Sequence, residues 1–323
     1  MIWAFCLSSA LTAASGLFLL PVLRRFKLGQ SIREEGPSWH MSKSGTPTMG
    51  GIMFILGITV TIFVLGWPLV RQGRYEHLTI LAFAWIYGGI GFADDFLKVA
   101  RRRNLGLTAR QKLVLQLAAA AVLLSVMHYM GDLENLVYIP FVGVTLPIEW
   151  LFLLFLSILF VTGFVNAVNL TDGVDGLCGG VTLPVAFFFA VICTSWGRPG
   201  ASLFAAALAG GVVGFLIFNF HPARVFMGDT GSLFLGGALC GLAFAANVPL
   251  LLIPVGLVYL VEMFSVILQV LYFKASKGKR LFRMTPIHHH FEMGGWSEKK
   301  IFFVFSLLTA AVCLATWIVE RRA

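Results

Sequence analysis

Long apolar stretches dominate this sequence, and they constrain the fold more than any other feature. A helix that crosses a bilayer needs about 20 largely apolar residues, and the chain offers about ten such stretches joined mostly by short connections. The sequence therefore predicts an all-α polytopic membrane protein, with residues 1–323 as a single transmembrane domain. The predicted spans are 2–23, 49–70, 79–97, 111–130, 150–168, 178–195, 201–218, 231–246, 249–272 and 301–319.

The composition argues against a soluble domain carrying one membrane anchor. Hydrophobic residues make up 58% of the chain and charged residues only 12%, against about 45–50% and about 25% in soluble domains. The net charge of +9 is attributed to orientation in the membrane and to anionic lipid head groups, so no nucleic-acid partner is predicted. The five cysteines form no C-x-x-C pair, and we interpret them as small apolar residues.

The basic residues predict the orientation of the spans. Alternating the sides of the membrane gathers most Lys and Arg residues into one set of connections, which the positive-inside rule assigns to the cytoplasm. Both termini are then extracytoplasmic. On the outer side, β-prone runs around Val142-Gly143 predict a small hairpin near 137–148. The predicted cytoplasmic connections are 24–48, 98–110, 169–177, 219–230 and 273–300.

The aspartates follow the same asymmetry. Of six aspartates, only Asp132 falls on the predicted outer side. A purely solubilising role would scatter carboxylates over both sides, and ionisable groups near membrane depth mark function by default. The remaining five are therefore candidate functional residues: Asp94, Asp95, Asp172, Asp175 and Asp229.

Asp94 and Asp95 end the third predicted span. Adjacent helical residues diverge by about 100°, so one carboxylate can face a cleft while the other faces a neighbouring helix. A helix C-terminus disfavours anions, so two of them there need compensation. The alternative is a solvated helix end paired with Lys98 and Arg101.

A polar string follows the fifth span, in which Asn166, Asn169 and Asp172 are spaced by three residues and Asp175 lies between two glycines. Side chains at this spacing share one helical face. Their oxygen atoms suit a hard cation or sugar hydroxyls, and the alternative is a turn with Asx caps.

The connection between the seventh and eighth spans runs from Asn219 to Gly231. Asp229 or Thr230 can N-cap the eighth helix, and the same glycine-rich geometry can bind a phosphate. Phe226 is predicted either to stack on a base or to pack within the loop.

Three further segments carry polar residues of interest. His288-His289-His290 lacks a nearby fourth soft ligand, so imidazoles that orient phosphates are favoured over zinc. Residues 43–51 resemble a phosphate loop only loosely and predict a basic, glycine-rich cap. Glu262, inside the ninth span, predicts a carboxylate that faces a polar partner within the bundle.

In combination, these segments resemble the family of phospho-N-acetylmuramoyl-pentapeptide transferases, within the polyprenyl-phosphate N-acetylhexosamine-1-phosphate transferases. They occur in the family's order, and the His-His-His-Phe-Glu segment discriminates best among relatives. The matching pieces are Lys43 to Gly51, Asp94-Asp95 with Lys98, Asn166 to Gly176, Asn219 to Gly231 and Thr285 to Glu292.

The resemblance implies a dimeric, ten-helix, Mg²⁺-dependent enzyme of the bacterial cytoplasmic (inner) membrane with its active site on the cytoplasmic face. Undecaprenyl phosphate would attack UDP-N-acetylmuramoyl-pentapeptide, giving undecaprenyl-diphospho-muramoyl-pentapeptide (lipid I) and UMP in peptidoglycan biosynthesis. Other partners would be membrane lipids and a second copy of the chain.

The resemblance also implies residue roles. Asp229 would be the principal metal ligand, and one residue of the Asp94-Asp95 pair a base on the lipid phosphate. Phe226 would lie against uracil. Catalytic roles fall to Asp94, Asp95, Asp229 and His288, and substrate binding to Lys43, Thr48, Lys98, Asn166, Asn169, Asp172, Asp175, Asn219, Phe226, His289 and His290.

Two other functions stay open at this stage. A transferase acting on UDP-N-acetylglucosamine would share the aspartate motifs. An ion-coupled transporter would place polar residues near the bilayer midplane, whereas here they cluster at one side. The sequence also permits either direct attack by the lipid phosphate or a covalent aspartyl-phosphate, and direct attack is favoured.

Overall fold

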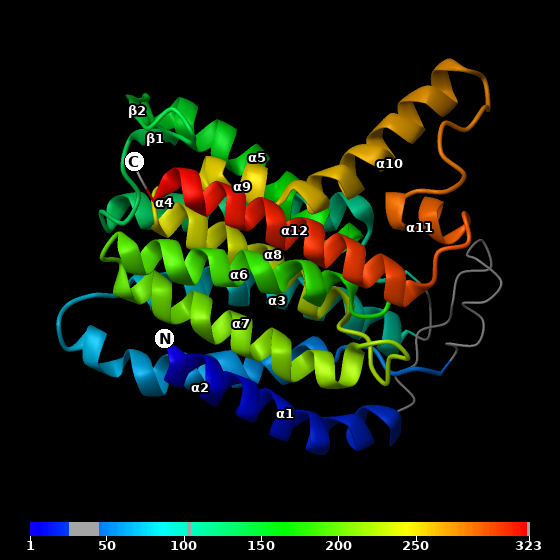
Figure 1. The fold of residues 1–323 in the computed structure, drawn as a ribbon, viewed down its shortest axis with the longest axis horizontal. Coiled ribbons are helices and arrows are strands. Elements are labelled where there is room, and N and C mark those ends of the chain that lie inside the picture. The colour runs from blue at the N-terminus through cyan, green and yellow to red at the C-terminus, as the bar shows by residue number, and fades with distance from the viewer. Residues whose placement is uncertain (26–44, 102–104, 322–323) are drawn as a thin grey trace.

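The computed structural model describes residues 1–25, 45–101 and 105–321 as a bundle of antiparallel helices (Figure 1). Within these residues, ten helices are long and apolar enough to cross a membrane. They are α1 (Ile2–Arg25), α2 (Gly51–Val70), α3 (Glu76–Ala100), α4 (Ala109–Tyr129), α5 (Trp150–Leu170), α6 (Leu177–Ser195), α7 (Pro199–Asn219), α8 (Gly228–Ala245), α10 (Leu257–Ala275) and α12 (Glu298–Glu320). The predicted number of spans is confirmed.

The ninth predicted span is wrong as a single helix over 249–272. The chain instead forms a 3₁₀ turn η2 (Pro249–Leu251) and a short α9 (Leu252–Val255), and α10 begins only after Gly256. Proline lacks a backbone N–H, and Pro249 and Pro254 interrupt the ladder that a continuous helix needs. A side chain at Gly256 would overlap the Phe164 ring, so the chain turns tightly against α5 here. From this break α10 diverges from the other helices (Figure 1).

The two ends of the bundle differ in character. We call the end that carries residues 94–95, 171–176 and 220–229 the aspartate end, and the opposite end the hairpin end. There, β1 (Leu136–Ile139) pairs antiparallel with β2 (Val144–Pro147), which confirms the predicted hairpin within two residues. The first and last helices both have their free ends at the hairpin end (Figure 1).

One carboxylate fastens the hairpin to the bundle. Glu320, at the end of α12, accepts a hydrogen bond from the Tyr138 hydroxyl at 2.5 Å and another from the Phe141 backbone N–H at 2.7 Å. The Glu320 residue is only 1% exposed, so this contact is internal. An isolated hairpin of two short strands is only marginally stable, and the hydrogen bonds to Glu320 hold this one against the bundle.

The centre of the bundle is the pair α3 and α8. Side chains at Gly91, Gly237 or Gly241 would overlap the opposite helix, at Asp229, Tyr87 and Phe83 respectively. Small residues let two helices approach closely in an apolar environment. This approach brings the first turn of α8 beside the last turns of α3.

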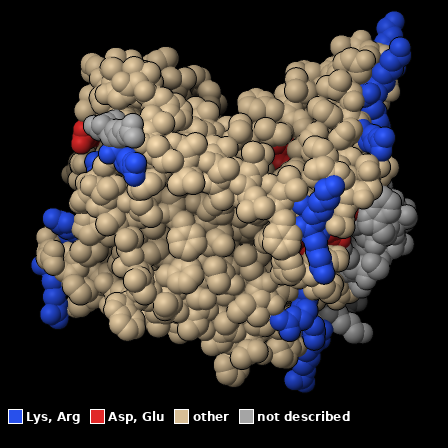
Figure 2. Space-filling view, viewed as in Figure 1, with Lys and Arg blue, Asp and Glu red and all other residues tan. Residues whose placement is uncertain are grey.

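The surface agrees with a membrane-embedded bundle. Figure 2 shows Lys and Arg at the two ends of the visible face, with an almost uncharged band between them. A belt of apolar side chains flanked by basic residues is typical of a protein solvated by lipid. The protein is a multi-pass membrane protein.

A short helix was not predicted. Residues Ile287–Glu292 form α11, which lies beside α10 and α12 at the aspartate end. The connection 273–300 was expected only as a basic segment followed by histidines. A single turn and a half of helix is too short to leave a periodic apolar pattern in the sequence.

Candidate active site

Three carboxylates meet where α3 and α8 touch. Asp94 and Asp95 come from the last turns of α3 and Asp229 from the first turn of α8, and each offers an oxygen atom within 4.8 Å of the other two. Lys98 lies among them, with its Nζ 2.6 Å from Asp94, 3.4 Å from Asp95 and 2.9 Å from Asp229. Lys98 supplies the compensation expected for Asp94 and Asp95, and it is the partner that the alternative interpretation named.

A second ammonium group completes the charge balance. Lys112, in the first turn of α4, places its Nζ 2.9 Å from Asp229 Oδ2, the same oxygen that Lys98 contacts. Lys112 is not among the predicted site residues. The only sequence feature that could have identified it is its position at the start of a span on the side where the aspartates lie.

The paired aspartates diverge as helical geometry requires. Asp94 Oδ1 accepts a hydrogen bond from the Leu107 backbone N–H at 2.8 Å, which fastens the connection between α3 and α4. Asp95 Oδ2 accepts from both the backbone N–H and the hydroxyl of Thr230, at 2.9 and 2.8 Å. Asp95 thus faces the neighbouring helix α8.

Asp95 also caps α8, which corrects one expectation. The helix begins at Gly228, and neither Asp229 nor Thr230 caps it, because both already lie in its first turn. A carboxylate from another helix satisfies the free Thr230 N–H instead. The cap comes from a residue 135 positions away, so no local pattern could reveal it.

The two asparagines of α5 have different partners. Asn169 donates through Nδ2 to Asp229 Oδ1 at 2.8 Å and to Ser232 Oγ at 2.7 Å. Asn166 donates to Gln116 Oε1 of α4 at 2.7 Å. The predicted polar stripe therefore exists, but only Asn169 touches an aspartate of the centre.

Asp172 begins the loop after α5 and is partly buried. Burial, reinforced by the negative charges of Asp229, Asp95 and Asp175, raises the pKa of its carboxyl well above the ordinary range. A raised pKa favours the neutral acid, which donates a hydrogen bond as well as accepting one. Asp172 therefore differs from Asp229, whose carboxylate contacts both Lys98 and Lys112.

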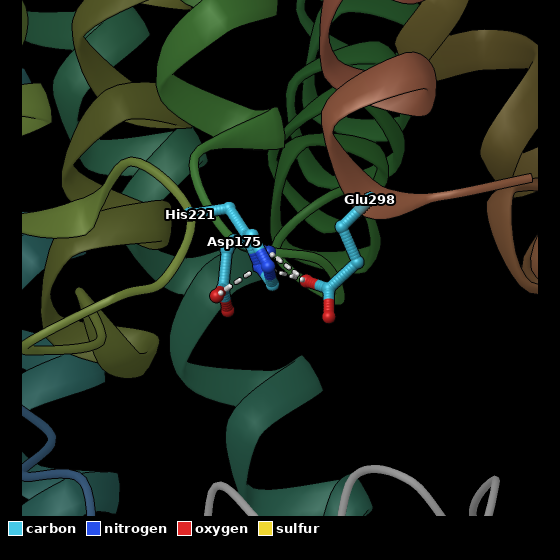
Figure 3. A group of neighbouring side chains, drawn as sticks. All are labelled: Asp175, His221 and Glu298. Atoms are coloured by element: carbon cyan, nitrogen blue, oxygen red, sulfur yellow. Dashed lines mark hydrogen bonds and ion pairs between the residues drawn. The ribbon is translucent and has the colours of Figure 1, made fainter.

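Asp175 belongs to a second cluster (Figure 3). His221 Nδ1 lies 3.0 Å from Asp175 Oδ2 and 3.6 Å from Glu298 Oε2, and the Ala223 backbone N–H donates to the same Asp175 oxygen at 2.9 Å. The three side chains come from the loop after α5, the loop after α7 and the start of α12. They tie these segments together at the aspartate end.

Asn219 supports the same loops from beneath. Its Oδ1 accepts from the Gly176 backbone N–H at 3.1 Å, and its Nδ2 donates to the Val225 carbonyl at 2.9 Å. The residue is 2% exposed, and both ends of its amide contact backbone. It holds the loops on either side of the site in register.

The three histidines point in different directions from α11. His288 is fully buried, with Nδ1 3.0 Å from Glu262 Oε2 of α10, which identifies the polar partner expected for Glu262. His289 Nδ1 lies 2.8 Å from Glu292 Oε2, and His290 Nδ1 accepts from the Arg283 backbone N–H at 3.1 Å.

One nitrogen of His288 lacks a partner among the described residues. Nε2 is buried without a hydrogen bond, and it approaches Gly173 so closely that a side chain there would overlap it. Gly173 directly follows Asp172. A buried polar atom without a partner is costly, and a ligand that supplies the missing hydrogen bond is one explanation for such an atom beside a polar loop.

The remaining predicted residues frame the loop before α8. Phe226 is partly buried, and its backbone N–H donates to the Pro47 carbonyl at 2.8 Å. Thr48 is buried beside Gly228, where a side chain would meet its hydroxyl. Lys43 lies outside the described residues.

The donor set of the aspartate centre fits a hard divalent cation. Its three potential ligands are all carboxylates, and Mg²⁺ prefers oxygen ligands with some positions left for water or phosphate. The second cluster, Asp175, His221 and Glu298, could also hold an ion by geometry. Its mixed nitrogen and oxygen donors suit Mg²⁺ less well.

Comparison with known proteins agrees with this geometry. The description "Glycosyl transferase family 4" matches residues 77–247, and "phospho-N-acetylmuramoyl-pentapeptide-transferase signature 1" matches residues 43–55. The first segment contains the whole aspartate centre, including both lysines, and the second contains Thr48.

Relatives named phospho-N-acetylmuramoyl-pentapeptide-transferase match nearly the whole chain. The protein from Desulforamulus reducens is 48% identical over 96% of this chain and 92% of its own length. That from Carboxydothermus hydrogenoformans is 46% identical over 96% of both chains, and that from Listeria welshimeri 42% identical over 94% of this chain and 93% of its own. The chain therefore belongs to the phospho-N-acetylmuramoyl-pentapeptide-transferase family.

Proposed function

We propose that this protein transfers phospho-N-acetylmuramoyl-pentapeptide from its UDP conjugate to undecaprenyl phosphate, giving lipid I and UMP. An oxygen of the lipid phosphate forms a bond to the sugar-linked phosphorus, and the bond from that phosphorus to the oxygen bridging it to UMP breaks. The observation that carries the proposal is the aspartate centre, three carboxylates within 4.8 Å beside two lysines, at one end of an apolar bundle.

The charges of the centre suit two anionic substrates. A diphosphate and a lipid phosphate repel each other, and phosphoryl transfer asks the protein mainly to position them and to neutralise charge. Lys98 and Lys112 supply positive charge, and Asp229 would be the principal ligand of Mg²⁺, with Asp94 and Asp95 close enough to contact the same ion. A metal held there would supply electrostatic stabilisation of the negative charge that develops on the departing UMP.

Among the aspartates, Asp94 is the candidate base. Asp95 holds the start of α8 through two hydrogen bonds on one oxygen, which assigns it a positioning role. Asp94 engages Lys98 through Oδ2, so movement of that lysine toward a phosphate would free this oxygen for a proton. This arrangement supports direct attack by the lipid phosphate.

The loops beside the centre form the candidate nucleotide-sugar wall. Asp172, as a neutral acid, would donate a hydrogen bond to a sugar or phosphate oxygen, and the free Nε2 of His288 faces the same loop. Phe226 would lie against uracil. Asn219 would act through the loops that it holds.

The site's location argues for an enzyme rather than a transporter. Its polar residues lie at one end of the bundle, whereas a transporter places its binding site near the bilayer midplane. We further propose that the aspartate end faces the cytoplasm of the bacterial inner membrane, that both termini are extracytoplasmic, and that the protein is a homodimer, as the family resemblance implies.

UMP release by detergent-purified protein tests the proposal. With undecaprenyl phosphate and UDP-N-acetylmuramoyl-pentapeptide, release should require both the lipid and Mg²⁺ and should stop in EDTA. UDP-N-acetylglucosamine in place of the pentapeptide conjugate should give none, and release from it alone would assign the protein to the other transferase class.

The variant Asp229→Ala tests the metal assignment in the same assay. The substitution should abolish UMP release. The variant should still unfold in a cooperative thermal transition, which shows that it is folded. Glu134→Ala, at the hairpin end, is the control and should release UMP at the normal rate. Mg²⁺-dependent turnover by folded Asp229→Ala would contradict the assignment.

A further inference from the structure

A pocket at the hairpin end lies far from the aspartate centre. It has a volume of about 510 Å³ and forms where the α2–α3, α4–β1 and α6–α7 connections meet. This volume is in the range of small-molecule sites. Its polar and aromatic lining consists of Arg74, Tyr75, Glu76, Asp132, Trp196 and Arg198.

The pocket presents an unsatisfied carboxylate. Oε2 of Glu76 is buried and has no hydrogen-bond partner among the described residues. This oxygen faces Gly200 at the start of α7, so Oε1 is the oxygen of the Glu76 carboxylate that a ligand in the pocket can reach. A carboxylate oxygen gains most from a donor that carries positive charge.

The pocket also presents guanidinium groups with free N–H donors. Arg198 uses Nη1 to donate to the Ala245 carbonyl at 3.0 Å, which fixes the side chain and leaves its other N–H groups available. Arg74 is exposed, and its side chain makes no hydrogen bond or ion pair within the part of the chain described. The N–H donors of a guanidinium group are spaced to bind two oxygens of one phosphate.

The fourth charged residue of the pocket, Asp132, already has a hydrogen-bond partner. Asp132 Oδ2 accepts from the Thr79 hydroxyl at 3.1 Å, so this carboxylate is held in place on the pocket wall. The pocket therefore combines fixed charges of both signs. A purely anionic ligand would satisfy the arginines but face Glu76 and Asp132, and a simple cation would leave the arginines unused.

The location indicates where a ligand of both charges would come from. Tyr75 and Trp196 flank the pocket at helix ends, the depth at which aromatic residues meet lipid head groups. Trp196 packs edge-on against Tyr138, with ring centroids 6.3 Å apart, so this wall is braced by the hairpin. The pocket lies at the boundary between apolar bundle and water.

We propose that this pocket binds a phosphoethanolamine group, a phosphate and a primary ammonium in one molecule, as in the head group of phosphatidylethanolamine. The phosphate would lie against Arg74 and Arg198, and the ammonium would donate to Glu76 Oε1. A quaternary ammonium has no N–H to donate, so a choline head group should bind less well. A glycerol head group lacks the positive charge altogether.

Native mass spectrometry of delipidated protein in detergent tests the proposal. Phosphatidylethanolamine should bind about tenfold more tightly than phosphatidylcholine or phosphatidylglycerol, the ratio expected for one charge-assisted hydrogen bond. Glu76→Gln should remove this preference, whereas Arg74→Gln should weaken the binding of all three lipids, because each carries the phosphate. Comparable affinities of the three lipids for the native protein, an unchanged preference in Glu76→Gln, or unchanged affinities in Arg74→Gln would overturn the proposal.

Matched controls separate the pocket from general surface charge. Arg71→Gln and Glu134→Gln change charges at the same end of the bundle but outside the pocket, and both should keep the preference. All four variants should release UMP normally, because the aspartate centre is at the opposite end. Arg74 is exposed, so Arg74→Gln tests the pocket even if Glu76→Gln fails to fold.

A competition arm identifies the source of the head group. Displacement of phosphatidylethanolamine by glycerophosphoethanolamine at similar concentration supports recognition of the free zwitterion. Binding that resists this soluble competitor but still depends on Glu76 and Arg74 supports a lipid held partly by its acyl chains.

Discussion

At the scale of single residues, the aspartate centre is organised by charge compensation. Asp229 Oδ2 contacts two ammonium groups at 2.9 Å each, and its Oδ1 accepts from Asn169 at 2.8 Å. The sequence could single out Asp229, because it is one of five aspartates that gather on the predicted cytoplasmic side. It could not pair Asp229 with Lys112, which is 117 positions away and looks like any basic residue at a membrane boundary.

Lys112 therefore provides a test of the centre. Lys112→Gln removes one of the two positive charges on Asp229 and should lower the rate of UMP release by about tenfold or more, the worth of one charge-assisted hydrogen bond. Steady-state release at saturating Mg²⁺ measures this effect. Arg110→Gln, an exposed neighbour on α4, is the control, and equal rates in the two variants would remove Lys112 from the site.

At the scale of elements, the divergent helix α10 meets the site through α11. Glu262 Oε2 lies 3.0 Å from His288 Nδ1 and 3.3 Å from the His288 backbone N. The sequence predicted a polar partner for Glu262 but could not name it. The sequence pattern also did not reveal the break at Gly256. The run is apolar throughout in spite of its two prolines, and a hydropathy pattern does not show where a helix breaks.

The link between Glu262 and His288 predicts a rescue. Glu262→Ala leaves the imidazole without its partner and should lower UMP release about tenfold to a hundredfold, as expected when a positioning hydrogen bond is lost. Glu262→Gln keeps an oxygen acceptor and should recover most of the activity. The comparison uses release rates of variants with matched thermal midpoints, and equal loss in both would show that charge, not positioning, is required.

At the scale of the whole molecule, the hairpin joins the middle of the chain to its last helix. Tyr138 donates to Glu320, and partial burial together with the nearby Glu320 carboxylate raises the Tyr138 pKa from 10.0 to about 12. The sequence predicted the hairpin from its β-prone runs. It gave no indication of Glu320, because a contact across 182 positions depends on the assembled bundle.

This contact predicts an alkaline loss of stability. Because folding raises the Tyr138 pKa, its contribution is complete below pH 10 and is lost as pH rises toward about 12. Tyr138→Phe should lower the thermal midpoint at pH 8, and its deficit against the native protein should shrink between pH 10 and 12. Tyr129→Phe, at a side chain that is 93% exposed, is the control. A deficit that is constant with pH would exclude this role.

The cap that Asp95 provides to α8 has a consequence for how the protein is made. The carboxylate is synthesised with the third span, but Thr230 emerges only with the eighth. A nascent chain that has inserted seven spans therefore carries the acidic pair without its helix partner or Asp229. The catalytic centre can therefore form only late in synthesis, after the eighth span has been inserted. A chain that ends before this span would lack an active site.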